Sequence, residues 1–316
     1  AYRDFAAGVV LMTRNAVKSG IYIFQLVLEQ AVKYEFTDLA ADVSRILRRE
    51  YARVGGDYEK NQYYTNLHRR YEEKKRCEIL ATDYYETLVS YYLTKRSPNE
   101  DIHQLASTYF NELFPMAETV DTSAFYSTMF SVGIIKFSSV NDIENAIKIC
   151  EDALGILMPR KNTNRSTLVG ITLQKIAFYI QLRSSNSTEI KDLFRYALSI
   201  SEEGDFNWFR AHEIYFYSCI YSRNYNEALD IFEKIVQSSS FQLLEGSHHD
   251  NWLLLGGYLH LLAKLGVLNA AKVESIVGTF KFGKFFNEIE VLDKDKEGMN
   301  IPLVLLPVLF HLAQKT

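Results

Sequence analysis

The spacing of apolar residues constrains this chain more than any other sequence feature. Apolar residues recur every three or four positions along nearly every segment. In "NYNEALDIFEKIVQ", for example, one helical face would carry Tyr225, Ala228, Leu229, Phe232, Ile235 and Val236. No segment shows the alternating β-branched pattern of a strand. Only five prolines and fifteen glycines occur in 316 residues, and both types destabilise helix interiors. The sequence therefore predicts an all-α fold.

Short breaks such as "VGGD" (54–57) and "RSPNE" (96–100) divide the chain into roughly fifteen helices with short connections. Such spacing predicts an α-solenoid of stacked antiparallel helical hairpins. One long helix is expected near residues 57–96, where forty residues contain no glycine or proline. Asp57 is its expected N-cap. Asn141, followed three residues later by Glu144, predicts a capping box at the start of another helix.

One segment carries a family resemblance. "HEIYFYSCIYSRNYNEALDIFEKIV" resembles a tetratricopeptide repeat, because Ala228 and Phe232 stand at the small and aromatic positions of its second helix. The next unit matches the W-x2-L-G start through Trp252, Leu255 and Gly256. Equivalent first-helix positions are Ser90, Phe130, Gln174, His212 and Trp252, at steps of 38 to 44 residues. These steps exceed the family's usual ~34 residues, which implies longer helices or loops.

The resemblance covers residues 78–280 and suggests a domain plan. Residues 1–56 would form N-terminal helices, 57–96 the long helix that leads into the repeats, and 281–316 C-terminal capping helices. The apolar run "IPLVLLPVLFHLA" near the C-terminus is too short to cross a bilayer, so we expect a buried last helix and no membrane partner.

The expected long helix combines eight tyrosines with the cluster "HRRYEEKKR". Its eight Lys and Arg residues are balanced by seven Asp and Glu residues, and the formal net charge of the chain is -4. A nucleic-acid-binding helix needs an unbalanced basic face, so we expect no nucleic-acid partner. Two interpretations of the tyrosines in residues 57–76 stay open. They form a partner or homodimer surface, or they cover the N-terminal helices of the same chain.

Chemistry-bearing motifs are incomplete or missing in the sequence. "HEIYF" lacks the second histidine of the H-E-x-x-H zinc motif, and no glycine-rich phosphate-binding loop occurs. The cysteines Cys77, Cys150 and Cys219 are far apart, which disfavours a zinc or redox site. We therefore expect a protein that is not an enzyme and that holds no metal or cofactor. The sparse cysteines are typical of a cytoplasmic protein.

The tetratricopeptide resemblance implies a concave face that binds a protein or peptide. The expected peptide-binding residues on that face are Tyr91, Lys95, Lys175, Tyr179, Arg183, Arg210, Glu213, Tyr217, Tyr221 and His260. Tyrosines beside bases would suit a partner with acidic groups. The expected function is a non-catalytic binding scaffold. The alternatives are a peptide-sensing regulatory protein, or an accessory domain of an enzyme whose catalytic part lies outside this chain.

Overall fold

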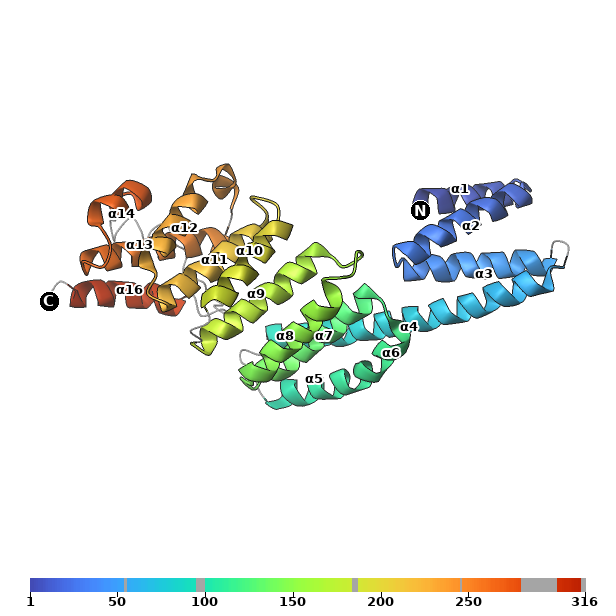
Figure 1. The fold of residues 1–316 in the computed structure, drawn as a ribbon, viewed down its shortest axis with the longest axis horizontal. Helices are drawn as coiled ribbons and strands as arrows, with labels where there is room; N and C mark the ends of the chain where they lie inside the picture. The colour runs from blue at the N-terminus through green and yellow to red at the C-terminus, as the bar shows by residue number, and fades with distance from the viewer. Residues whose placement is uncertain (54–55, 95–99, 184–186, 245, 280–299, 314–316) are drawn as a thin grey trace. The chain divides into compact units, whose positions relative to one another are not determined.

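The computed structural model describes residues 1–53, 56–94, 100–183, 187–244, 246–279 and 300–313. These residues form helices and connecting turns, and no strand occurs among them, which confirms the all-α prediction. The chain divides into two compact units, residues 1–164 and residues 165–316. Figure 1 shows the helices of both units in chain order.

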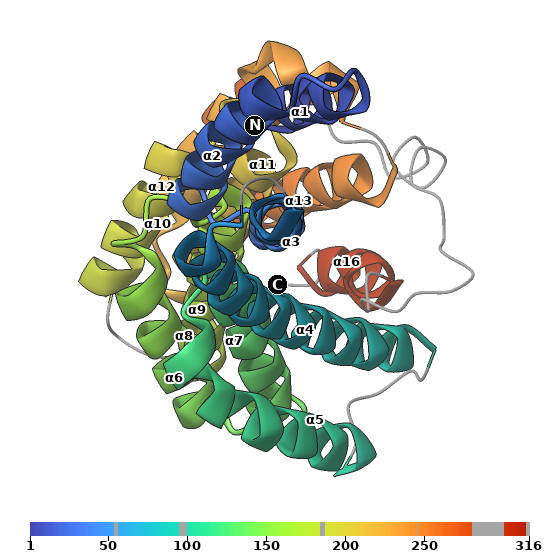
Figure 2. The same cartoon turned by 90° about the vertical axis from the view of Figure 1, so that its right-hand side faces the viewer.

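In the first unit, successive helices pack against one another. Its elements are α1 (Tyr2–Thr13), α2 (Val17–Lys33), α3 (Thr37–Arg53), α4 (Tyr58–Thr94), α5 (Glu100–Leu113), η1 (Phe114–Met116), α6 (Ala117–Val120), α7 (Ser123–Ser138) and α8 (Ile143–Leu157). Helices α1 and α2 lie side by side in both views (Figures 1 and 2). Helix α4 contacts α3 and also reaches α5 and α7. It therefore connects the N-terminal helices to the rest of this unit.

Helix α4 is 37 residues long and confirms the predicted long helix. The backbone N–H of Lys60 donates to Asp57 Oδ1 over 3.0 Å, so Asp57 is the N-cap as expected. Later in the chain the predicted cap is displaced by one residue. Asp142 accepts from the N–H of Asn145, whereas Asn141 lies in the preceding turn at φ 59°.

Two of the four tyrosines in the first half of α4 pack within the chain itself. Tyr64 is buried, and its ring stacks on Tyr51 of α3 with centroids 5.5 Å apart. Tyr71 packs against the same core. Tyr58 and Tyr63 remain exposed. The structure thus shows the covering role for part of this stripe, and a homodimer through residues 57–76 stays a prediction.

The second unit also stacks each helix on its neighbours, which is compatible with a helical repeat. Its elements are α9 (Arg165–Gln181), α10 (Ser187–Ile200), α11 (Phe206–Tyr221), α12 (Tyr225–Gln237), η2 (Ser239–Leu243), α13 (Gly246–Lys264), α14 (Ala270–Val277) and α16 (Asn300–Leu312). Ala228, Phe232 and Trp252 are all buried in one core. The Phe232 and Trp252 rings lie 6.1 Å apart. The residues that carry the family resemblance therefore lie where helices cross.

Helix α16 is buried on one face only, so the expectation of a buried last helix is confirmed for that face. Leu303, Leu306 and Phe310 pack against α13, and the Tyr258 hydroxyl donates to the carbonyl of Pro302 over 2.8 Å. The outer face exposes the aliphatic side chains of Ile301, Val304, Leu305, Val308, Leu309 and Leu312. Among the described helices, none is both long and apolar enough to cross a membrane.

Candidate functional site

Of the two predicted concave residues in the first unit, Tyr91 lines a surface hollow together with other residues of α4. The Tyr91 hydroxyl donates to Asp101 Oδ2 of α5 over 3.3 Å, so its polar end is engaged within the chain. Lys95 lies outside the described residues.

In the second unit, Lys175 and Tyr179 converge on one carboxylate. Lys175 Nζ lies 2.7 Å from Glu189 Oε1, and the Tyr179 hydroxyl donates to the same oxygen over 2.8 Å. Burial opposes ionisation of Glu189, but these two hydrogen bonds outweigh it and hold the pKa of Glu189 below its usual value. The charge of Lys175 is therefore already compensated by this chain.

A similar arrangement surrounds the predicted residues of α11. Arg210 Nη1 lies 2.5 Å from Glu213 Oε1, so this base too has an internal carboxylate partner. The hydroxyl of Tyr217 donates to Asn251 Oδ1 over 3.1 Å, and burial raises the pKa of Tyr217 to about 12. The hydrogen bond between Tyr217 and Asn251 joins α11 to α13, whereas the ion pair of Arg210 lies within α11.

The remaining predicted residues are dispersed. Arg183 is exposed in the turn after α9 at φ 49°, and Tyr221 is exposed at the end of α11. His260 is half-buried in α13, and burial lowers the pKa of its imidazole. The structure thus brings Lys175 to Tyr179 and Arg210 to Glu213, but both bases are neutralised within the chain. Peptide binding by this set stays a prediction.

Among the described residues, no group of three or more His, Cys, Asp or Glu side chains is placed to hold a metal ion. A surface hollow between α3 and α4 is lined by Arg48, His68, Arg69, Glu72, Glu73, Lys75, Arg76 and Ile79. Residues of both charge signs line this hollow. Lys75 pairs with Asp38 of α3 and Arg76 pairs with Glu73.

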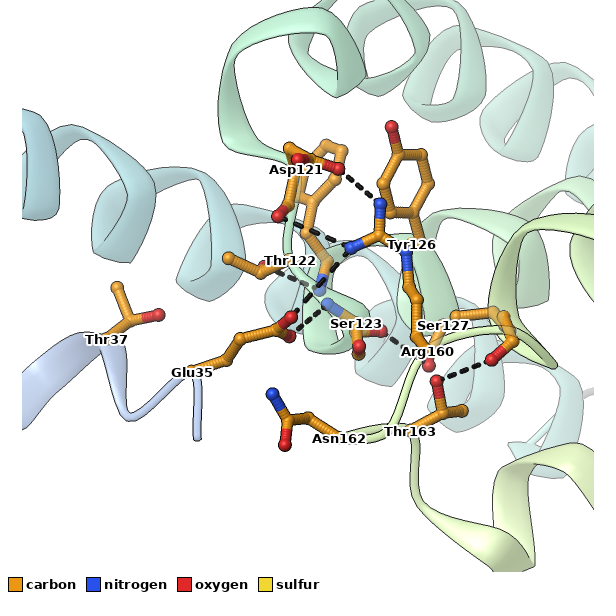
Figure 3. Close-up of polar contacts among 12 residues, drawn as sticks. Glu35, Thr37, Asp121, Thr122, Ser123, Tyr126, Ser127, Arg160, Asn162 and Thr163 are labelled. Carbon is orange, nitrogen blue, oxygen red and sulfur yellow. Dashed lines mark hydrogen bonds and ion pairs between the residues drawn. The ribbon is translucent and has the colours of Figure 1, made fainter. Parts of the chain in front are cut away.

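The densest polar cluster joins four parts of the first unit. We call it the polar junction, and it consists of Glu35, Thr37, Lys74, Glu78, Asp121, Thr122, Ser123 and Arg160. These residues come from the α2–α3 turn, from α4, from the start of α7 and from the segment after α8. Figure 3 shows that the side chains of Glu35, Asp121 and Arg160 point toward one another.

Local backbone conformation places two of the carboxylates. Glu35 lies in the α2–α3 turn at φ 56°, and Asp121 follows α6 at φ 39°. Both residues follow the end of a helix, a position where a single left-handed residue commonly occurs. Asn15, Asn141, Arg183 and Arg223 adopt the same conformation in other turns of this chain.

Glu35 lies at the N-terminus of α7. Its Oε2 accepts from the backbone N–H of Ser123 over 2.7 Å, where the helix has unpaired donors and a partial positive charge. Thr122 is the N-cap and accepts from the N–H of Phe125. The α2–α3 turn is therefore attached to α7 through a carboxylate.

Arg160 joins the two left-handed acidic residues. Its guanidinium is paired with Asp121 through Nη2, and its Nη1 lies 3.9 Å from Glu35 Oε1 (Figure 3). The same guanidinium lies over the ring of Tyr126, 4.7 Å from the centroid. Nearby, the Asn162 amide donates to the carbonyl of Lys33 over 2.9 Å. The segment after α8 thus holds the α2–α3 turn from its other side.

Glu78 of α4 forms the inner part of the junction. Its Oε1 accepts from the hydroxyls of Thr37 over 2.8 Å and of Thr122 over 2.6 Å, and both threonines are buried. Burial raises the pKa of Glu78, although the two hydroxyl hydrogen bonds act in the opposite direction. This carboxylate links the first residue of α3 to the N-cap of α7.

Lys74 lies one turn before Glu78 and is only 8% exposed. It makes no hydrogen bond or ion pair within the described part of the chain. Burial lowers the pKa of Lys74, and the nearby Arg70 charge lowers it further. Asp121, Glu78 and Glu35 act in the opposite direction. The arrangement as a whole can hold negative charge, because helix N–H, hydroxyl, guanidinium and ammonium donors gather there.

An exposed aromatic cluster lies on the same turn. Tyr2, Tyr34 and Phe36 are 61%, 48% and 38% exposed, respectively. The ring of Phe36 lies 5.9 Å from that of Tyr2 and 6.0 Å from that of Tyr34, measured between centroids. Lys33 Nζ lies 5.3 Å from the Tyr34 ring centre. The residue between the two exposed rings of this turn is Glu35.

Sequence reasoning missed both the junction and this cluster. It treated "EFT" (35–37) and "MPRKNTNRS" (158–166) only as helix breaks. A usable signal was present, because "KYEFT" places an acidic residue between two aromatic residues in a turn.

No protein-family model, curated protein or solved structure matches this chain.

Proposed function

We propose that this protein is a non-catalytic, tetratricopeptide-like scaffold that binds a protein or peptide partner. The observation that carries the proposal is the aromatic cluster of Tyr2, Tyr34 and Phe36. Exposed aromatic rings that touch one another bring large apolar area to an interface at a low cost in side-chain entropy. Tyrosine is also enriched among the residues that dominate binding energy.

The surroundings of the cluster favour a partner segment with an apolar side chain and a carboxylate. The three rings offer the apolar contact. Lys33 is exposed beside Tyr34 and supplies a positive charge for an acidic group. This proposal keeps the class of function that the sequence suggested. It places binding at the α2–α3 turn because Lys175 and Arg210 already have carboxylate partners.

The test uses affinity capture from the cells that make the protein, followed by quantitative mass spectrometry. The double variant Tyr34→Ser/Phe36→Ser should lose partners that the wild type retains by tenfold or more, because rings at the centre of an interface carry most of its binding energy. Tyr22→Ser, which changes an exposed tyrosine of α2 outside the cluster, is the matched control and should retain them. Direct titration of each purified partner then gives the change in Kd.

A third variant separates the two surfaces. Tyr221→Ser changes an exposed member of the predicted concave lining in the second unit. If partners are lost with Tyr221→Ser and kept with the double variant, the binding site belongs to α11 and the proposal for the turn is wrong. Circular dichroism of each variant checks that the helices are intact.

A further inference from the structure

We propose that the polar junction is a binding site for an oxyanion, a carboxylate or phosphate group, and that Glu35 occupies it as an internal ligand. This proposal rests on the proposed function in one respect: in the cell, the bound protein or peptide partner would supply the oxyanion. The site itself follows from the donors that surround Glu35.

The first observation is the donor set at the start of α7. The N–H of Ser123 donates to Glu35 over 2.7 Å, and α7 is 16 residues long, so its N-terminus carries the full partial charge of a helix end. The Arg160 guanidinium reaches the other oxygen of the same carboxylate at 3.9 Å. A helix N-terminus beside an arginine is a common setting for bound phosphate or carboxylate groups.

The second observation is independent of Glu35. The Ser123 side chain is 3% exposed, and its Oγ has no hydrogen-bond partner among the residues that the structure describes. An unpaired buried hydroxyl costs free energy, and functional sites are one of the accepted explanations for such groups. This hydroxyl belongs to the same residue whose N–H binds Glu35 and makes no hydrogen bond to that carboxylate, so an unused donor lies next to the oxyanion position.

The third observation concerns charge. Lys74 is buried without a direct partner, and the charged groups that act on it are Arg70, Asp121, Glu78 and Glu35. The junction contains two bases, Lys74 and Arg160, and three carboxylates, Glu35, Glu78 and Asp121. Removal of Glu35 leaves two bases and two carboxylates, so the negative charge that opposes an external anion at this position is gone. An anion bound at the vacated position would restore the charge that the wild type carries there.

Glu35 is suited to leave this position because it lies on a turn rather than within a helix. Tyr34 and Phe36, which precede and follow Glu35 in the sequence, belong to the exposed aromatic cluster. The residues that would contact a partner are therefore the immediate neighbours of the internal ligand. A partner that binds these rings and carries a carboxylate would offer the same chemical group as Glu35. Exchange of one carboxylate for the other conserves the charge of the junction.

The test needs no partner and uses the full chain. Glu35→Gly removes the carboxylate, and glycine adopts φ 56° without strain. Asn15→Gly is the matched control, because Asn15 is an exposed residue at φ 60° in the α1–α2 turn. Thermal unfolding is followed in chloride, in acetate and in inorganic phosphate at the same ionic strength.

We expect acetate or phosphate to raise the Tm of Glu35→Gly well above any effect on wild type or Asn15→Gly, since a ligand that binds only the folded state stabilises it. Adding Arg160→Gln to Glu35→Gly should weaken anion binding by tenfold or more in calorimetric titration. A response to acetate alone points to a peptide carboxylate, and a response to phosphate alone points to a phosphate group.

If Glu35→Gly does not fold in chloride, folding restored by either anion supports the site. If neither anion restores folding, the same measurement is made on Glu35→Gln, which keeps the side-chain volume and loses the charge. A folded Glu35→Gly or Glu35→Gln that gains no more from these anions than wild type overturns the proposal. Because the capture experiment uses no added anion, the two proposals can fail separately.

Discussion

At the scale of single residues, several buried polar groups of this protein bind partners within the same chain. His212 is buried in α11, and its Nδ1 lies 2.8 Å from the carbonyl oxygen of Trp208, one turn earlier. Lys175 is equally enclosed beside Glu189. Substitution of such a residue therefore destabilises the fold, because it leaves a buried partner unpaired. Its effect on binding cannot be separated from this loss of stability without a control.

His212 predicts a pH dependence of stability. Burial lowers the pKa of its imidazole from 6.5 to about 4, so the folded state favours the neutral form. As the pH falls from 6.5 toward 4, the unfolded state binds a proton that the folded state does not. The free energy of unfolding should decrease over this range by up to about 3 kcal/mol. Denaturant unfolding at a series of pH values measures the slope.

His212→Gln keeps a side-chain donor for the Trp208 carbonyl and should remove this part of the slope. His311→Gln, at an exposed position of α16, is the control and should keep the wild-type dependence. An unchanged slope in His212→Gln would show that another group causes the acid sensitivity.

At the scale of helices, close approach depends on residues without large side chains at the crossings. A Cβ atom on Gly256 of α13 would lie 2.9 Å from Val277 Cγ1 and 3.1 Å from the ring of Phe232. On Gly170 of α9 it would meet nothing within 4 Å. The two glycines thus have opposite roles, although both lie inside helices.

These glycines give a paired prediction. Gly256→Ala should destabilise the protein by about 1–3 kcal/mol, because the added methyl group overpacks the crossing of α12, α13 and α14. Gly170→Ala should stabilise it by up to about 1 kcal/mol through helix propensity. Chemical denaturation of both variants measures the two changes. Equal effects of the same sign would contradict the packing at Gly256.

The sequence predicted the features that depend on local pattern. Asp57 as a cap, the length of α4 and the burial of Ala228 and Phe232 follow from residues a few positions apart. The polar junction does not. Glu35 and Arg160 are separated by 125 positions, and the left-handed conformation of Glu35 leaves no mark in its residue type. Only the fold brings these residues together.

The same distinction applies to the predicted lining of the concave face. The helical faces of α9 and α11 were expected from spacing, but the pairing of Lys175 with Glu189 requires α9 to pack on α10 in one register. A sequence shows that bases and acids are present and does not show which of them neutralise one another. Of the bases expected on this face, Lys175 and Arg210 are therefore less available to an acidic partner than the sequence suggested.

At the scale of the whole molecule, each compact unit has a hydrophobic core of its own. One core lies among α2, α3 and α4 of the first unit, and another extends from α9 to α14 in the second. Contacts that stabilise one of these cores come from residues of the same unit. Each unit is also large enough to bury a core by itself.

The division predicts that residues 1–164 and 165–316 fold as separate fragments. Each fragment should give a helical far-UV circular dichroism spectrum and a cooperative thermal transition. The reason is that its buried apolar side chains already have their partners within the fragment. A fragment that stays unfolded under conditions where the full chain is folded would show that its core is incomplete.

The geometry of the first unit has a mechanical meaning. Helix α4, about 55 Å long at 1.5 Å per residue, is a rod fixed to α3 on one stretch and to α5 and α7 on another. A rod alone leaves the N-terminal helices free to pivot about its axis. The polar junction is a second point of attachment away from that axis, and two such points make a brace. Release of Glu35 would therefore loosen this brace, which the hydrogen bond from Asn162 to the Lys33 carbonyl would still hold in part, and any displacement would be greatest at the tip farthest from α4, where α1 lies.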